Sequence, residues 1–228
     1  MIKNILIILS IQTLLVASSQ IILVVSEESN SPRAKLFCYE NKKQVFDVIE
    51  VNLGKNGLGW GIGEKEFPNS LIDKKEGDKR APAGIFKLTH IFGYKADKTY
   101  NLPYIHATKS LMCVDDSEDI NYNKIVPKST PLPKSYEEMK RDDEQYSLGI
   151  VVEHNKEAKK GMGSCIFIHV EKGENEPSSG CTTMKYNDLN KIVEWLDGDK
   201  NPILIQITKD SLNTTKELYP VLENHKED

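Results

Sequence analysis

The chain has 228 residues, which is enough for one domain with a full hydrophobic core, so it does not need disulfide bonds to hold a small scaffold together. Its formal net charge is −4, and lysines and acidic residues are interspersed along it. Because this pattern gives neither a basic face nor an acidic tail, it argues against nucleic-acid binding.

Residues 1–19 have the pattern of a secretory signal peptide. A lysine near the start precedes an apolar run from Ile5 to Val16, and small residues follow from Ala17 to Ser19. An uncleaved membrane anchor is the alternative, because Ile21 to Val25 is apolar too, but a polar Ser-Ser-Gln step interrupts that span. In both cases we expect an exported protein of the periplasm or cell envelope.

The first half of the remaining chain is predicted to form strands. Short β-branched and aromatic runs separated by turn residues predict an antiparallel meander over residues 20–28, 33–40 and 44–54, and a further strand over 85–92. The glycine-rich stretch before that strand lacks the Gly-Lys-Ser/Thr ending of a phosphate loop and is interpreted as a turn.

A long polar connection covers residues 93–147. Connections of this length inside one domain are typical of functional or mobile segments. Within it, Ser135 lies three residues before Glu138, a capping-box spacing that predicts a short helix from Ser135.

The last third combines strands with helices. Strands are predicted over three apolar runs, residues 147–155, 164–170 and 201–208. A helix is predicted over 188–197, where Leu189, Ile192, Val193 and Leu196 form one apolar face, and a last helix over 209–219.

Strands dominate these predictions, so the fold class is mostly β with a few α-helices. We expect a single domain over residues 20–208, followed by a C-terminal helix and frayed tail over 209–228.

A histidine and a cysteine are separated by one short loop. His169 lies near the end of the strand-like stretch 164–170, and Cys181 follows Ser-Ser-Gly. A cysteine attacks as a thiolate, so it needs a base and a setting that favours negative charge. His169 is the candidate base, and the N-terminus of a helix expected after Cys181 is the candidate electrostatic aid. Gly180 allows a sharp turn, and the N–H groups around it and Cys181 could hold an oxyanion.

Four cysteines in an exported chain suggest disulfide bonds, but their spacing gives no framework: Cys38, Cys113, Cys165 and Cys181. If Cys181 remains a free thiol, the other three allow at most one bridge. Strand alternation puts Cys165 on the same face as His169, about 13 Å away, too far to be its partner.

Other hydrolase classes do not fit. Papain-like proteases have the histidine more than a hundred residues after the cysteine, and caspases carry a Gln-Ala-Cys signature. A zinc hydrolase would need a spacing such as HExxH, and the stretch DDSEDINYN lacks the terminal glutamate of an EF-hand. The sequence therefore predicts neither a metal nor a cofactor.

The order of histidine, short loop and Ser-x-Gly-Cys resembles the L,D-transpeptidase catalytic domain, the YkuD-like family, in its short-loop branch. The resemblance extends from Gln20 to Thr208 and includes the successive stretches NLGKNGLGWG, EGDKRAPAGIFKL, LPYIHAT, CVDDSEDINYNKIV, MKRDDEQYSLGIVVEHN and CIFIHVEKGENEPSSGCTTM. It implies a β-sandwich or barrel-like domain that works without a cofactor on the stem peptides of peptidoglycan.

The resemblance also implies roles for single residues. Cys181 looks like the nucleophile that accepts the acyl group, and His169 like its general base, with Ser179 and Gly180 as backbone contributors that orient the histidine and the oxyanion. Substrate-side or loop-holding roles are implied for Asp115, Asp116, Tyr122 and Asn123.

Three positions depart from the family pattern. The family's His-Gly is His169-Val170 here, the histidine before its Gly-Cys is Ser179, and the arginine or asparagine two residues after its cysteine is Thr183. Recognition of the substrate carboxylate would then fall to another cation, with Arg80 or Lys185 as hypotheses.

The implied reaction is L,D-transpeptidation of the stem tetrapeptide through a Cys181 thioester. With water as acceptor the enzyme would be an L,D-carboxypeptidase, and the departures leave open a catalytically weakened wall-binding module. We expect a monomer, with a membrane tether only if the N-terminal segment is not cleaved.

Overall fold

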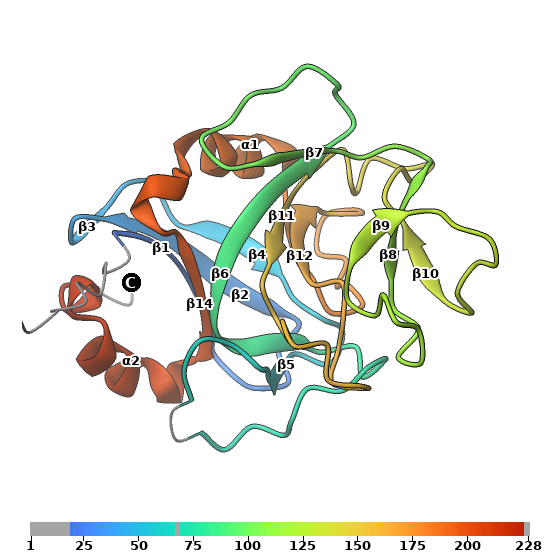
Figure 1. The fold of residues 1–228 in the computed structure, drawn as a ribbon. Helices are drawn as coiled ribbons and strands as arrows, with labels where there is room; N and C mark the ends of the chain where they lie inside the picture. Colours follow the sequence, from blue (N-terminus) through green and yellow to red (C-terminus); the bar gives the residue numbers. More distant parts are fainter. Residues whose placement is uncertain (1–18, 67–68, 226–228) are drawn as a thin grey trace, which may run out of the picture.

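One large sheet closes into a barrel in the computed structural model of the protein, which describes residues 19–66 and 69–225 (Figure 1). Around the barrel the strands follow the order β1, β14, β6, β11, β12, β13, β4 and β2, and the pairing of β2 with β1 closes the ring. Their bounds are β1 Gln20–Ser26, β2 Arg33–Glu40, β4 Ile49–Asn52, β6 Ala81–Gly93, β11 Leu148–Val152, β12 Phe167–Val170, β13 Thr182–Met184 and β14 Ile203–Thr208. The predicted signal segment lies, except for Ser19, outside the described residues.

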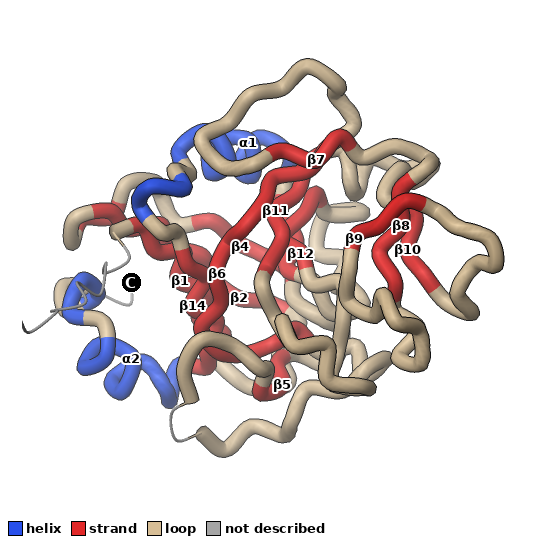
Figure 2. The backbone as a smooth tube through the Cα atoms, in the orientation of Figure 1, coloured by secondary structure: helices blue, strands red, loops and turns tan. Residues whose placement is uncertain are grey.

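Three short strands extend this sheet. β3 (Lys43–Gln44) pairs with β2, while β5 (Leu58–Trp60) and β7 (Tyr104–His106) pair with β6. The predicted antiparallel meander is confirmed, because β1 pairs with β2 and β2 with β4, both antiparallel. The mostly β fold class and its barrel-like form are also confirmed, as Figure 2 shows by the extent of strand.

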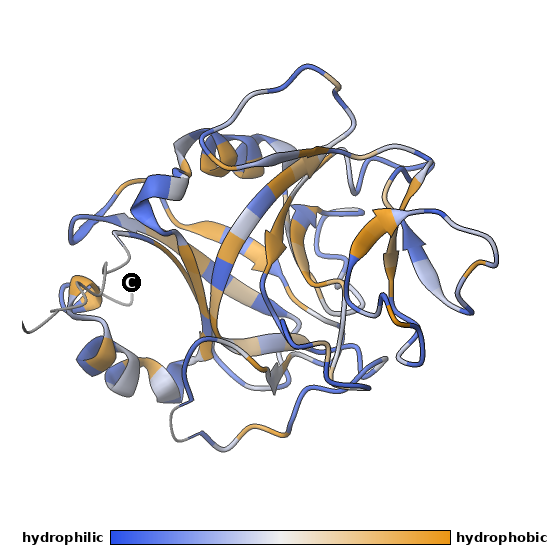
Figure 3. Cartoon of the chain, in the orientation of Figure 1, coloured by the Kyte–Doolittle hydropathy of each residue, from blue (hydrophilic) through white to orange (hydrophobic). Residues whose placement is uncertain are grey.

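The first strand is apolar throughout because both of its faces are buried. Ile22 and Val24 belong to the same core cluster as Leu189 of α1 (Tyr186–Trp195), whereas Ile21 and Leu23 pack with Leu212 of α2 (Leu212–Leu218). Burying one such side chain stabilises the fold by about 1.5–3 kcal/mol. Figure 3 shows the resulting concentration of apolar residues on the barrel strands.

Both predicted helices are confirmed, with 3₁₀ turns at Gly198–Lys200, Lys209–Ser211 and Pro220–Leu222.

The long polar connection forms a second sheet of three strands. β8 (Leu111–Val114) is its middle strand, flanked by β9 (Ile125–Pro127) and β10 (Tyr136–Glu138). The predicted helix from Ser135 is wrong, because residues 136–138 pair antiparallel with β8 instead. In Figure 1 this small sheet lies beside β11 and β12, on the side of the barrel opposite to α2.

A disulfide bond joins the small sheet to the barrel. Cys113 of β8 is bonded to Cys165, two residues before β12, while Cys38 and Cys181 are free and buried. A third core cluster fills the space beneath the small sheet and contains Phe92, Cys113, Met139, Tyr146, Cys165, Phe167 and Cys181. The free cysteine that follows Ser-Ser-Gly therefore lies between the barrel and the small sheet.

None of the helices within residues 19–66 and 69–225 is both long enough and apolar enough to cross a membrane.

Candidate active site

The histidine and the cysteine are brought together by two neighbouring parallel strands. β12 carries His169, and β13 begins directly after Cys181 and pairs with β12 so that His169 lies opposite Thr183. The connecting segment therefore doubles back, as the sequence predicts. Both side chains line one cleft of about 600 Å³, whose other walls include the small sheet and the 74–77 and 141–146 segments.

His169 is held by a carbonyl group of its own strand. Its Nδ1 lies 2.8 Å from the carbonyl oxygen of Val170, and the ring is only 4% exposed. Because a carbonyl can only accept, Nδ1 carries the proton and Nε2 has the free lone pair of the neutral ring. The carbonyl of Val170 thus orients the imidazole, and no hydrogen bond joins the ring to Ser179 or Gly180 among the described residues. Tyr146 packs against the same ring in a T-shaped arrangement, with the two centroids 5.0 Å apart.

Cys181 is fixed by the backbone of the strand beside it. The N–H of Phe167 donates to Sγ at 3.3 Å, and the thiol donates to the carbonyl oxygen of Cys165 at 3.6 Å. No hydrogen bond joins Cys181 to His169 among the described residues, although both face the cleft. The expected helix N-terminus is not present at Cys181, because β13 intervenes and α1 begins only at Tyr186.

Burial keeps both groups uncharged at neutral pH. It raises the pKa of the Cys181 thiol to about 12, and the nearby carboxyl group of Glu137 acts in the same direction. It lowers the pKa of His169 to about 4, because the imidazolium ion loses its hydration. The resting pair is therefore a thiol and a neutral imidazole, rather than a thiolate stabilised by a helix end.

We expect iodoacetamide to alkylate Cys181 slowly at pH 7. Since the thiol pKa is about 12, the reactive thiolate should increase about tenfold per pH unit between about pH 7 and 10. Mass spectrometry of the labelled peptides measures this rate, and the buried Cys38 serves as an internal control that stays unlabelled. A rate that levels off below pH 8 would reveal a thiolate in the resting state and contradict this description.

Ser178, which was not singled out from the sequence, holds the loop that leads to Cys181. Its hydroxyl group donates to the carbonyl of Cys181 and accepts from the N–H of Gly180, while its backbone bonds to Leu53 and Lys55. The N–H of Gly180, which was expected to help to hold an oxyanion, is thus bonded to the Ser178 hydroxyl group. Ser179 is exposed but lines the cleft.

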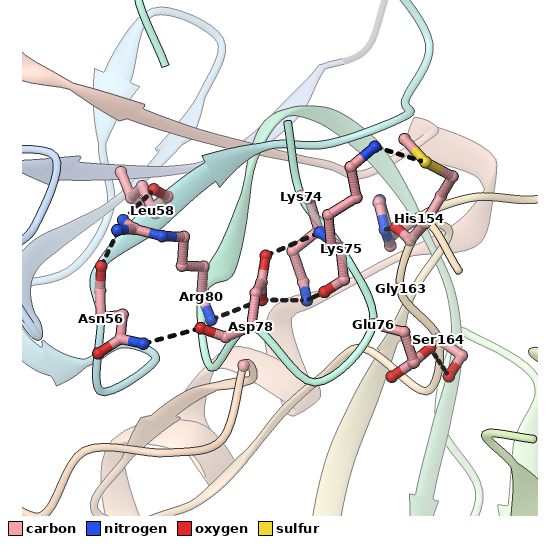
Figure 4. Close-up of polar contacts among 12 residues, drawn as sticks. Asn56, Leu58, Lys74, Lys75, Glu76, Asp78, Arg80, His154, Gly163 and Ser164 are labelled. Atoms are coloured by element: carbon pink, nitrogen blue, oxygen red, sulfur yellow. Dashed lines mark hydrogen bonds and ion pairs between the residues drawn. The ribbon is translucent and has the colours of Figure 1, made fainter. Parts of the chain in front are cut away.

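Gly180 is required by its conformation. Its φ is +155°, a region that other residues rarely adopt, and a Cβ atom would lie 3.1 Å from the carbonyl oxygen of Arg80. Arg80 itself points away from the cleft and donates to the carbonyls of Asn56 and Leu58 (Figure 4).

The two cations predicted to replace the family's arginine do not line the cleft. Arg80 holds a turn, and Lys185 precedes α1 and pairs with Glu174. The cations that do line the cleft, Lys74, Arg141 and Lys172, were not singled out from the sequence.

Of the four residues expected to contact substrate or to hold loops, one lines the cleft and three hold loops around it. Asp115, directly after β8, lines the cleft. Asp116 accepts from the N–H groups of Glu118 and Lys134, and these bonds hold the pKa of its carboxyl group below the usual range. Tyr122 donates to Glu76, and Asn123 accepts from the N–H of Cys165. The last three therefore hold loops around the cleft.

Comparison with known proteins assigns the sequence to a family. The family described as YkuD, L,D-transpeptidase catalytic domain, matches residues 20–207. No curated protein sequence matches the chain.

A solved structure, the helical cell shape determining protein Pgp2 from Campylobacter jejuni, is 15% identical, with a TM-score of 0.38. The likeness covers 82% of this chain but 47% of that one, so the chain spans less than half the length of Pgp2.

Proposed function

Because the chain belongs to the L,D-transpeptidase catalytic domain family, which matches it over residues 20–207, we propose that it is an exported cysteine enzyme acting on the stem tetrapeptides of peptidoglycan. The observation that carries the proposal is the shared cleft of Cys181 and His169. It is supported by the tautomer of His169, whose Nε2 is left free to accept a proton. The cell envelope is the proposed location, since residues 1–19 have a signal-peptide pattern.

In the proposed reaction the thiol and the imidazole act in sequence. As the substrate enters, Sγ leaves its contact with the Cys165 carbonyl and transfers its proton to Nε2 of His169. Sγ then bonds to the carbonyl carbon of the diamino acid at stem position three. The C–N bond to the terminal D-amino acid breaks, and its amine leaves with the proton from the imidazolium ion. The product of this half-reaction is a thioester on Cys181.

The second half-reaction regenerates the free thiol of Cys181. An acceptor amine loses a proton to His169 and attacks the thioester carbon, so that a new amide bond forms as the C–S bond breaks. Water in place of the amine gives the L,D-carboxypeptidase reaction by the same steps. Hydrogen bonds of such pairs are often long in an empty site and shorten when substrate binds, so the absence of a Cys181–His169 bond at rest is compatible with this order.

Digestion of purified muropeptides tests the proposed function. We expect the wild-type protein to release the terminal D-amino acid from tetrapeptide stems. Mass spectrometry then distinguishes the alternatives, because transpeptidation gives cross-linked or amine-exchanged products and hydrolysis gives free tripeptide. Binding to sacculi without any change in muropeptide mass would instead identify a wall-binding module.

A further inference from the structure

The charges that line the active-site cleft do not balance. Its three cations each have a carboxylate partner of their own: Lys74 pairs with Asp78 at 2.6 Å, Arg141 with Asp143 at 2.9 Å and Lys172 with Glu176 at 3.0 Å. Three further carboxyl groups line the same cleft, those of Glu76, Asp115 and Glu137. None of these three forms an ion pair with any described residue.

These three carboxyl groups come from different segments but influence one another. Glu76 accepts from the hydroxyl groups of Tyr122 and Ser164, the latter contact being drawn in Figure 4. Glu137 of β10 accepts from the hydroxyl group of Tyr146. Burial, together with the charges of Asp115 and Glu76, raises the pKa of Glu137 to about 7. The cluster is therefore electrostatically unfavourable as it stands, and a cation would relieve it.

Two buried polar atoms on the walls of the cleft lack a partner. Oδ1 of Asp115 is buried and forms no hydrogen bond within the described part of the chain. The same holds for Oγ1 of Thr183, whose residue is only 2% exposed and lies opposite His169. Native proteins satisfy nearly all buried polar groups with protein atoms or ordered water, so unpartnered atoms on two walls of one cleft are positions at which a polar ligand could supply the missing hydrogen bonds.

Among the described residues, no group of three metal-binding side chains is close enough to hold a metal ion. We propose that Asp115, with Glu76 and Glu137, binds the free side-chain ammonium group of the diamino acid in the substrate stem, while Thr183 hydrogen-bonds to the same ligand. The inference rests on the proposed function and adds a substrate requirement to it. Stems whose side-chain amine is already acylated, as in a cross-link, should bind poorly as acyl donors.

Calorimetric titration of the Cys181→Ala protein tests this subsite without turnover. The two ligands are tetrapeptide stems whose diamino acid carries either a free or an acetylated side-chain amine. We expect the free amine to bind about tenfold more tightly or better, the usual effect of a hydrogen bond to a charged group. Adding Asp115→Asn should remove this preference and leave the affinity for the acetylated peptide unchanged, which also shows that the variant is folded.

Asp142→Asn is the matched control, since its side chain is 99% exposed and, among the described residues, pairs only with Lys109; it should keep the preference. Equal affinity for the two peptides, no binding of either, or an Asp115→Asn protein that keeps the preference would overturn the subsite. Competition by micromolar Mg²⁺ or Ca²⁺ would overturn it in favour of a metal site. Failure to bind either peptide would also count against the proposed reaction, whereas the other outcomes overturn the subsite alone. Turnover by the wild-type protein tests the reaction separately.

Discussion

Replacing Cys181 with alanine should reduce the release of D-amino acid from tetrapeptide stems by at least about 10⁴-fold, the scale seen when a catalytic nucleophile is removed. Cys181 is the only free cysteine that lines the cleft within the described residues. Without Sγ no thioester can form, and His169 alone offers no covalent route. The rate is measured by mass spectrometry of digested muropeptides, with circular dichroism to verify the fold.

Cys38→Ala is the matched control for this prediction. Cys38 is buried in the barrel core on β2 and does not line the cleft, and burial holds the pKa of its thiol far above the usual range. Its replacement should leave the rate unchanged. Cys165 would be a poor control, because it forms the disulfide with Cys113 and its carbonyl accepts from the Cys181 thiol. Wild-type turnover by the Cys181→Ala protein would remove Cys181 from the mechanism.

Replacing His169 with alanine should lower the same rate by about 10²–10⁴-fold, the usual contribution of a general base. The resting thiol has a pKa of about 12, so it depends on a neighbouring base for ionisation at neutral pH. Added imidazole should restore part of the activity by occupying the vacated space. His106→Ala is the control, because His106 is an exposed residue of β7 that does not line the cleft.

The pH profile of the wild-type protein gives a second readout for His169. Only the neutral imidazole can accept the thiol proton, and burial lowers its pKa to about 4. Activity should therefore persist as the pH falls from 7 to about 5 and decline only as it approaches 4. A decline centred near pH 6.5, or full activity of the His169→Ala protein, would show that this imidazole is not the base.

Periodicity and composition were sufficient for most strands of the barrel but not for those of the small sheet, and the barrel-like form itself was implied only by the family resemblance. The meander of β1, β2 and β4 and the apolar face of α1 follow from patterns that are read along the chain. The capping-box spacing at Ser135 was misleading, because pairing of residues 136–138 with β8, a contact with a distant segment, overrode a local signal. The same limitation explains why a helix N-terminus was expected at Cys181. The strand that follows Cys181 instead, β13, has only three residues and depends on pairing with a neighbouring strand.

The site was predictable where its residues are close in sequence. His169 and Cys181 are separated by one short loop, so their order and spacing carried the information. The cations of the cleft could not be predicted, because Arg141 and Lys74 come from separate segments and only the fold brings them into the same cleft as Cys181. The sequence also could not show that Ser178 holds the loop before Cys181. That role depends on the direction of its side chain, which cannot be read from two adjacent serines.

The disulfide bond could not be assigned from spacing for the same reason. Cys113 and Cys165 are 52 residues apart, and their pairing depends on the small sheet lying against β12. That contact also forms one wall of the cleft, since Asp115 follows β8 and Glu137 belongs to β10.

The central claim is that Cys181 takes the acyl group of the stem peptide, and intact-protein mass spectrometry tests it most directly. The wild-type protein is mixed with tetrapeptide stem, quenched in acid within seconds, and digested to locate any added mass. We predict an adduct equal to the acyl tripeptide on the peptide that contains Cys181, which hydroxylamine removes and which the Cys181→Ala protein lacks. Turnover without any adduct at Cys181, or an adduct at another residue, would contradict the account.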